Sequence, residues 1–109
     1  MKEDARRAVA CAAALRASKK AASSIYSYEK GRHSFMSTSY DYDTSSHLSG
    51  VKSGNIYHYG LGAHISLNVS GRNFSGFDYD SSSHFSGTIS GRSIQLYDYG
   101  EARYFNYSV

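Results

Sequence analysis

The sequence predicts a mainly β protein of the α+β class, in which an N-terminal helix precedes an antiparallel meander of about seven to nine strands. Three observations lead to this prediction. Residues 1–24 are basic and rich in alanine. From residue 25 onward, apolar and polar residues alternate with a period of two. Similar segments also begin at His47, His64 and His84, and a short aromatic stretch follows each of them.

The length of 109 residues allows one domain, residues 1–109. Its two parts are the helix, within residues 1–24, and the Ser-, Gly- and Tyr-rich hairpin repeats of residues 25–109. Leu, Ile, Val and Phe together number only 19. The net charge of +3 is too small for a disordered chain. We therefore expect a folded domain in which tyrosine supplies much of the apolar surface.

The helix is expected over residues 4–23. Ala5, Ala8, Val9, Ala12 and Leu15 recur at helical spacing and form one narrow apolar stripe. Since only two of these side chains are large, we expect the helix to dock weakly and to be the least stable element. Residues 1–33 carry a net charge of +5 and residues 34–109 carry −2, so the basic character is expected to belong to the N-terminal segment.

The hairpin region divides into short strands because Gly-containing turns punctuate it. The predicted strands cover residues 25–28, 33–42, 47–52, 55–59, 64–69, 74–79, 84–89, 94–99 and 103–108. One face of the sheet takes the aliphatic side chains and some phenylalanines: Leu48, Ile56, Ile65, Leu67, Val69, Phe74, Phe85, Ile89, Ile94 and Leu96. The other face takes Tyr57, Tyr59, Phe77, Tyr79, Tyr97, Tyr99, His47, His64 and His84.

The area of the aliphatic face limits how this sheet is covered. Nine strands of six residues give a face of about 860 Å², whereas a helix of 20 residues covers only about 300 Å². Because monomers rarely expose several hundred Å² of apolar surface, two solutions remain open. The sheet curls into a barrel-like form, or two copies pack face to face in a homodimer.

The tyrosine and histidine face is the candidate binding surface. In a meander, His47, His64 and His84 start alternate strands and therefore lie at the same end of the sheet. With three tyrosines from the neighbouring strands they form an aromatic band suited to stacking sugar rings or bases. The candidate ligand-binding residues are Tyr59, His64, Tyr79, His84, Tyr99 and His47. The alternative is a cross-strand aromatic ladder that only stabilises the sheet.

Metal and cofactor chemistry find little support in the sequence. Alternate strands lie about 10 Å apart, too far for three histidines to share one zinc ion. The two segments that begin at Asp41 and Asp78 have the D-x-D-x-S spacing that begins a calcium loop, but the next glycine is absent, and an Asp-rich turn explains them better. No G-x-S-x-G elbow and no G-x-G-x-x-G loop is present. We expect no metal and no cofactor.

The resulting functional prediction is a small non-catalytic binding or interaction module that uses its Tyr/His-rich sheet face. Two alternatives remain: a nucleic-acid binder that contacts phosphates through the basic N-terminal helix, and a small metal-dependent hydrolase. The partner is unknown and could be a small ligand, another protein or a second copy of the chain. A single cysteine, Cys11, fits a cytoplasmic protein, and no apolar run is long enough to span a membrane.

Overall fold

The computed structural model of the chain describes residues 1–20 and 23–109. Within these ranges it contains one helix, α1 (Glu3–Ser18), followed by ten strands. The strands are β1 (Ser24–Ser27), β2 (Arg32–Phe35), β3 (Tyr40–Asp41), β4 (Ser46–Ser49), β5 (Ile56–His58), β6 (Ala63–Ser70), β7 (Asn73–Asp78), β8 (Ser83–Ser90), β9 (Ser93–Asp98) and β10 (Arg103–Ser108).

All ten strands form one antiparallel sheet in the order β2-β1-β10-β9-β8-β7-β6-β5-β4-β3. The predicted meander is therefore confirmed, although residues 33–42 form two strands instead of one. The chain reverses between them, where the N–H of Ser37 bonds to the carbonyl of Tyr40 at 2.9 Å. A bridge between Met36 and Asp41 joins the two edge strands, so the sheet is nearly closed into a barrel. Of the two coverings considered for the sheet, the curled form is the one observed.

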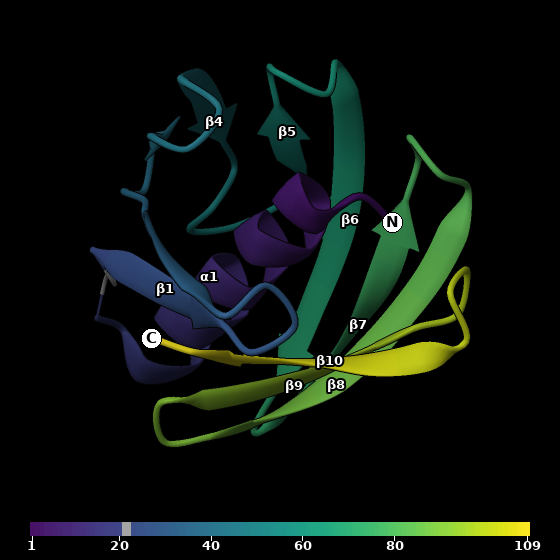
Figure 1. The fold of residues 1–109 in the computed structure, drawn as a ribbon. Coiled ribbons are helices and arrows are strands. Elements are labelled where there is room, and N and C mark those ends of the chain that lie inside the picture. The colour runs from purple at the N-terminus through teal and green to yellow at the C-terminus, as the bar shows by residue number, and fades with distance from the viewer. Residues whose placement is uncertain (21–22) are drawn as a thin grey trace.

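The helix lies inside the barrel, with the strands wrapped around it (Figure 1). Ten consecutive residues, 5–14, are buried, so every side of α1 faces the sheet. The expectation of a weakly docked helix with one narrow stripe is therefore wrong. Six of these ten residues are alanine, and their single-carbon side chains make α1 thin enough to fill a narrow barrel. The helix covers the whole inner face of the sheet because that face surrounds it.

The helix ends earlier than expected, at Ser18. Lys19 adopts a left-handed conformation (φ 63°) and donates its N–H to the carbonyl of Leu15, a common helix stop. The remainder of the predicted helix, residues 19–23, includes Ala21 and Ala22, which lie outside the described residues.

The inner wall carries the aliphatic face that the alternation predicts. Ile56, Ile65, Ile94 and Leu96 are at most 1% exposed, and the other predicted members are buried or half-buried against them. Gly76 and Gly87 make room for two aromatic rings. A β-carbon at Gly76 would collide with the carbonyl of Ser66 and the ring of Phe85. The phenylalanines can therefore lean across the sheet only because glycine stands opposite them.

The two ends of the barrel differ in their turns. At the end where α1 stops, hereafter the C-helix end, two-residue turns place Gly71 (φ 60°) and Gly91 (φ 58°) first, the glycine position of a type II′ hairpin. At the end where α1 starts, hereafter the N-helix end, five wider turns each contain one left-handed residue three positions after a tyrosine. These residues are Gly31, Ser45, Gly62, Ser82 and Ala102.

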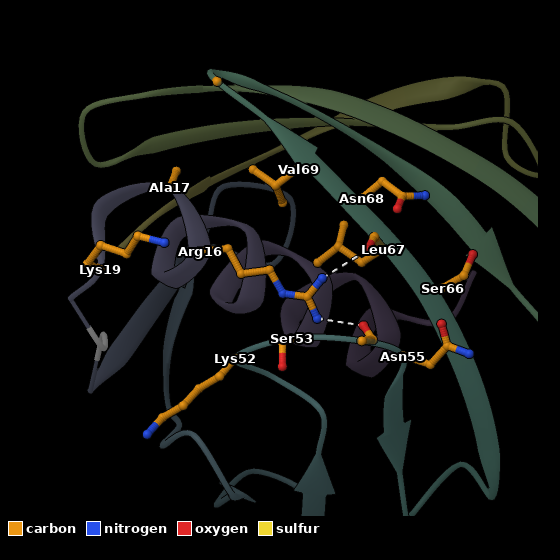
Figure 2. Close-up of a pocket in the computed structure, with 12 residues that line it drawn as sticks. Arg16, Ala17, Lys19, Lys52, Ser53, Asn55, Ser66, Leu67, Asn68 and Val69 are labelled. Atoms are coloured by element: carbon orange, nitrogen blue, oxygen red, sulfur yellow. Dashed lines mark hydrogen bonds between the residues drawn. The ribbon is translucent and has the colours of Figure 1, made fainter.

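Arg16 fastens the helix to the C-helix end (Figure 2). Its guanidinium donates hydrogen bonds to four backbone carbonyls, those of Gly50, Val51, Gly54 and Leu67, at 2.7–3.1 Å. One side chain therefore fixes the β4–β5 connection against β6. Partial burial lowers the pKa of Arg16 from its ordinary value. Arg16 is still cationic at neutral pH, because the ordinary pKa of arginine is far above 7.

Candidate functional site

A motif of three aromatic residues occurs five times around the barrel. An aromatic residue and a tyrosine lie two positions apart, and a histidine or tyrosine follows five positions after that tyrosine. The five triads, from which the outer surface of the N-helix end is built, are Tyr26–Tyr28–His33, Tyr40–Tyr42–His47, Tyr57–Tyr59–His64, Phe77–Tyr79–His84 and Tyr97–Tyr99–Tyr104. We call them together the aromatic belt.

Each triad has the same internal geometry. The first-named residue of each triad is its central ring, and the tyrosine two positions later is its tip tyrosine. The central ring lies 4.6–5.1 Å, centroid to centroid, from each of the other two rings, in an edge-to-face arrangement. The central residue also pairs directly with the histidine or tyrosine of the next strand. The central rings are half-buried, whereas the tip tyrosines are 58–63% exposed. Edge-to-face pairs of this kind contribute about 0.5–1.5 kcal/mol each.

All six candidate residues from the sequence lie on this outer surface and are exposed: His47, Tyr59, His64, Tyr79, His84 and Tyr99. They belong to four different triads and do not form one cluster. The ring of His64 packs against Tyr57 at 4.6 Å. The backbone N–H of Tyr79 bonds to the carbonyl of His64, so neighbouring triads are linked through the main chain.

Two open grooves cross the outer wall near the last two triads. A groove of about 620 Å³ has Phe74, Tyr97, Tyr99 and Tyr104 as its aromatic lining. The aromatic lining of the second groove, of about 570 Å³, consists of Phe77, His84, Phe85 and Tyr99. The polar side chains that line them are hydroxyls and amides: Asn73, Ser86, Thr88 and Gln95 in the first, and Ser66, Asn68, Ser75 and Ser86 in the second. Tyr99 is shared by both grooves, and neither is lined by Asp, Glu, Lys or Arg.

A second repeated feature lies behind the belt, inside the barrel. The residue between the first two aromatic residues of each triad points inward, and all five are polar and buried: Ser27, Asp41, His58, Asp78 and Asp98. We did not predict this polar ring. The signal was present, because strand alternation sends the residue between two outward side chains to the opposite face.

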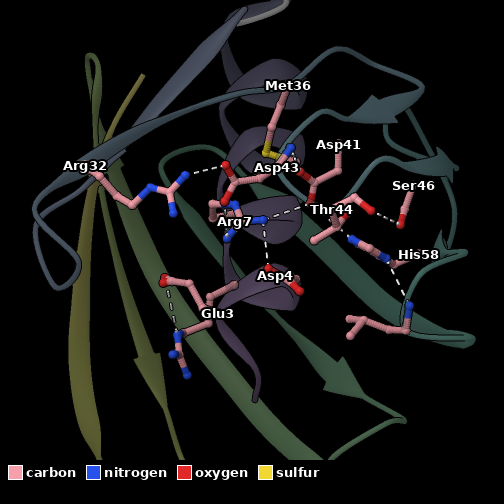
Figure 3. Close-up of polar contacts among 12 residues, drawn as sticks. Glu3, Asp4, Arg7, Arg32, Met36, Asp41, Asp43, Thr44, Ser46 and His58 are labelled. Atoms are coloured by element: carbon pink, nitrogen blue, oxygen red, sulfur yellow. Dashed lines mark hydrogen bonds and ion pairs between the residues drawn. The ribbon is translucent and has the colours of Figure 1, made fainter.

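Arg7 of α1 is the cation that meets this ring on one side (Figure 3). Its guanidinium lies 3.0 Å from Oδ2 of Asp41 and 2.8 Å from Oδ1 of Asp4. Burial alone would lower the pKa of Arg7, but the two carboxylates outweigh burial and raise it. Burial raises the pKa of Asp41, yet the hydrogen bond from His58 and the charge of Arg7 reverse this effect, and the net pKa is lowered. Both groups therefore stay charged at neutral pH.

His58 completes this cluster through both of its ring nitrogens. Its Nδ1 accepts the backbone N–H of Leu61 at 3.2 Å, so the proton of a neutral ring sits on Nε2. Nε2 then donates to Oδ2 of Asp41 at 3.2 Å. Since both ring nitrogens are engaged and both side chains are fully buried, the pair cannot pass a proton to a substrate, and its role is structural.

Arg6 is the cation that contacts the polar ring on its other side, at Asp98. Its Nη1 lies 3.1 Å from Oδ2 of Asp98, and the amino group of Met1 lies at the same distance from that oxygen. The guanidinium also stacks on the ring of Phe105, 3.8 Å from the centroid. Two of the three arginines of the basic helix, Arg6 and Arg7, are therefore buried and paired with carboxylates.

The segments with calcium-like spacing form turns. In each, the first aspartate accepts the N–H of the residue two positions later, at 3.0 Å for Asp41 and 3.1 Å for Asp78, which is the Asx-turn arrangement. Across residues 1–20 and 23–109, no group of three His, Cys, Asp or Glu side chains is placed to hold a metal ion. In the same ranges, no helix is long and apolar enough to cross a membrane.

Comparisons with known proteins do not assign this site. No protein-family model, curated protein or solved structure matches the chain.

Proposed function

We propose that this protein is a non-catalytic binding module whose aromatic belt holds a neutral, polyhydroxylated ligand such as an oligosaccharide. The observation that carries the proposal is the composition of the two grooves, in which exposed aromatic rings stand beside hydroxyl and amide side chains. Aromatic faces stack on the C–H surface of a sugar ring, and hydroxyls and amides can exchange hydrogen bonds with sugar hydroxyls.

The lack of charged side chains in the two grooves favours sugars over nucleotides as ligands. Nucleic acids owe most of their affinity to cations that contact phosphates, and no cation lines either groove. A neutral ligand needs no cation in its binding site. The belt therefore favours sugar rings over bases.

The buried acid–base pair supports the non-catalytic part of the proposal. A general base must come within hydrogen-bond reach of its substrate, and His58 and Asp41 are fully enclosed. The exposed histidines each pack against an aromatic ring and have no carboxylate partner among the ion pairs of the described residues. A metal-dependent hydrolase is not favoured by any observation.

Titration of the protein with four pentasaccharides, of cellulose, amylose, chitin and laminarin type, tests the proposal. The chain has no tryptophan, so tyrosine fluorescence and amide chemical shifts report binding directly at the belt. We expect at least one sugar to bind and to shift the amides of Ser86, Thr88 and Gln95. The absence of binding by all four would refute the sugar class.

Tyr99→Ala is the informative variant because Tyr99 lines both grooves. We expect it to weaken binding about tenfold, equivalent to about 1.4 kcal/mol of stacking. Tyr42→Ala is the matched control, since Tyr42 is also a tip tyrosine, 59% exposed, but lines neither groove. Equal losses in the two variants would show that the belt acts only as a stabilising ladder.

Two further expectations belong to this proposal. The single buried cysteine fits a protein of the cytoplasm. A homodimer is no longer needed to cover the aliphatic face, so self-association would have to use the belt or another outer surface.

A further inference from the structure

Charged side chains are segregated between the two ends of the barrel. All nine Asp and Glu residues of the chain lie at the N-helix end, in the first turn of α1, on the polar ring or in the wide turns. Six cations share that end: Lys2, Arg6, Arg7, Lys30, Arg32 and Arg103. The other six lie at the C-helix end: Arg16, Lys19, Lys20, Lys52, Arg72 and Arg92. The formal charge of the side chains is therefore −3 at one end and +6 at the other.

The ion pairs follow the same division. At the N-helix end, every cation except Lys30 lies within ion-pair distance of a carboxylate. At the C-helix end, no cation forms an ion pair with Asp or Glu in the part of the chain that the structure describes. Five of its six cations are exposed, and Arg16 is half-buried. The cations of this end therefore have no acidic side chain as an ion-pair partner in residues 1–20 and 23–109.

Compensation of the helix dipole explains only three of the six cations at the C-helix end. Arg16, Lys19 and Lys20 stand at the C-terminus of α1, where cations are favoured. Lys52, Arg72 and Arg92 instead come from three separate connections between strands. They share an end of the barrel with the C-terminus of α1 only because the chain is folded, and this end forms a basic surface without any acidic side chain.

We propose that this basic surface binds the phosphate backbone of nucleic acid. A groove of about 580 Å³ lies within it, lined by Arg16, Lys19 and Lys52 and also by Asn55 and Asn68 (Figure 2). Lys, Arg and Asn side chains are common phosphate contacts, and such contacts carry affinity without reading sequence. This groove shares Ser66 and Asn68 with the second groove of the belt, but its cations, Arg16, Lys19 and Lys52, do not line that groove.

The turns of this end favour nucleic acid over an anionic membrane. Their exposed tips are Gly71–Arg72, Gly91–Arg92 and Lys52–Ser53–Gly54, which contain no large apolar side chain that could enter a bilayer. Six of the seven exposed large aromatic residues belong to the belt. The seventh, Phe35, lies beside Tyr42, to which it is linked through its carbonyl. Because the surface would bind through cations that contact phosphates, we expect binding without preference for base sequence.

Fluorescence anisotropy with a labelled DNA duplex of about 20 base pairs, measured from about 50 to 200 mM NaCl, tests the proposal. The informative variant is Arg72→Gln with Arg92→Gln. The matched control is Lys2→Gln with Lys30→Gln, which removes the same charge from exposed positions at the N-helix end. Thermal unfolding of all three proteins verifies that the fold is retained.

We expect the parent to bind the duplex with an affinity that falls steeply with salt. Loss of two phosphate contacts should reduce the slope of log K against log salt by about 1.8 in the Arg72/Arg92 variant, and the control should keep the parental slope. Two results would overturn the proposal: absence of salt-dependent DNA binding, or an equal loss in the control variant. A third is binding to vesicles with about one-third phosphatidylserine without binding to DNA, which would assign the surface to membranes.

Discussion

The guanidinium Nη2 of Arg7 lies 3.0 Å from Oδ2 of Asp41, and both side chains are buried. This ion pair joins the central helix to β3, the strand at one edge of the nearly closed sheet. The same aspartate accepts the hydrogen bond of His58 and bridges to Met36 through its backbone. This one residue therefore connects the helix to both edges of the nearly closed sheet, whose junction beside Met36 and Asp41 we call the seam.

Asp41→Asn should destabilise the protein by about 3–5 kcal/mol, because it removes the fully buried one of the carboxylates that compensate the charge of Arg7. Urea unfolding measures this loss. Glu29→Gln is the control, since Glu29 pairs with Arg103 at the exposed rim and should cost less than about 1 kcal/mol. A similar small loss in both variants would mean that Arg7 finds full compensation from Asp4 and Asp43.

The lowered pKa of Asp41 makes this contribution depend on pH. Since the folded pKa lies below the unfolded value of about 3.9, the stabilisation is complete above that pH and is lost as pH falls through the folded pKa. The difference in unfolding free energy between the parent and Asp41→Asn should therefore be constant from about pH 5 to 7 and shrink below about pH 4. A difference that grows on acidification would contradict the assigned direction.

Ala10→Leu should destabilise the protein strongly, by more than about 1–3 kcal/mol, because Ala10 is fully buried between the helix and the wall. Ala17→Leu, in the same helix but exposed, should have almost no effect. Thermal unfolding compares the two. A neutral result at Ala10 would show that the barrel wall yields to the larger side chain.

The amides of residues 8–14 should rank among the slowest to exchange hydrogen, together with those of β6 and β8. They lie in the interior, so exchange needs opening of the barrel around them. Hydrogen exchange followed by NMR measures their protection. Early exchange of the whole helix would contradict a packed interior and would support the weak docking that the alanine stripe suggested.

Cys11 should resist thiol reagents while the protein is folded. Burial raises its pKa to about 12, so at pH 8 the reactive thiolate is almost absent and access is blocked. Reaction with a chromogenic disulfide should be slow in buffer and rapid in concentrated urea. Fast labelling of the native protein, with no accompanying unfolding, would show that the seam beside Met36 opens readily.

The alternation of side chains was the most reliable guide in the sequence. It placed Ile65, Leu67 and Ile94 on the inner wall and His64 and Tyr79 on the outer one, because a strand gives its side chains only two directions. It also contained the polar ring, since Asp78 stands between Phe77 and Tyr79 and must therefore face inward. That inference needed only the alternation, applied to the aspartates as well as to the aliphatic residues.

By itself, the sequence determined the antiparallel meander, the inner and outer faces and the position of the candidate band, because these follow from local periodicity and short turns. Only the tertiary structure decided where the helix lies and which charges remain free. The helix enters the barrel because alanine makes it thin on all sides, a property that matters only once the sheet curves around it. Inside the barrel, ion pairs with Asp98 and Asp41 offset the charges of Arg6 and Arg7, while Lys52, Arg72 and Arg92 lie in turns at the end where α1 stops. The basic surface therefore moves from the start of the chain to the opposite end of the barrel, since long-range packing, not the order of residues, determines which charges meet.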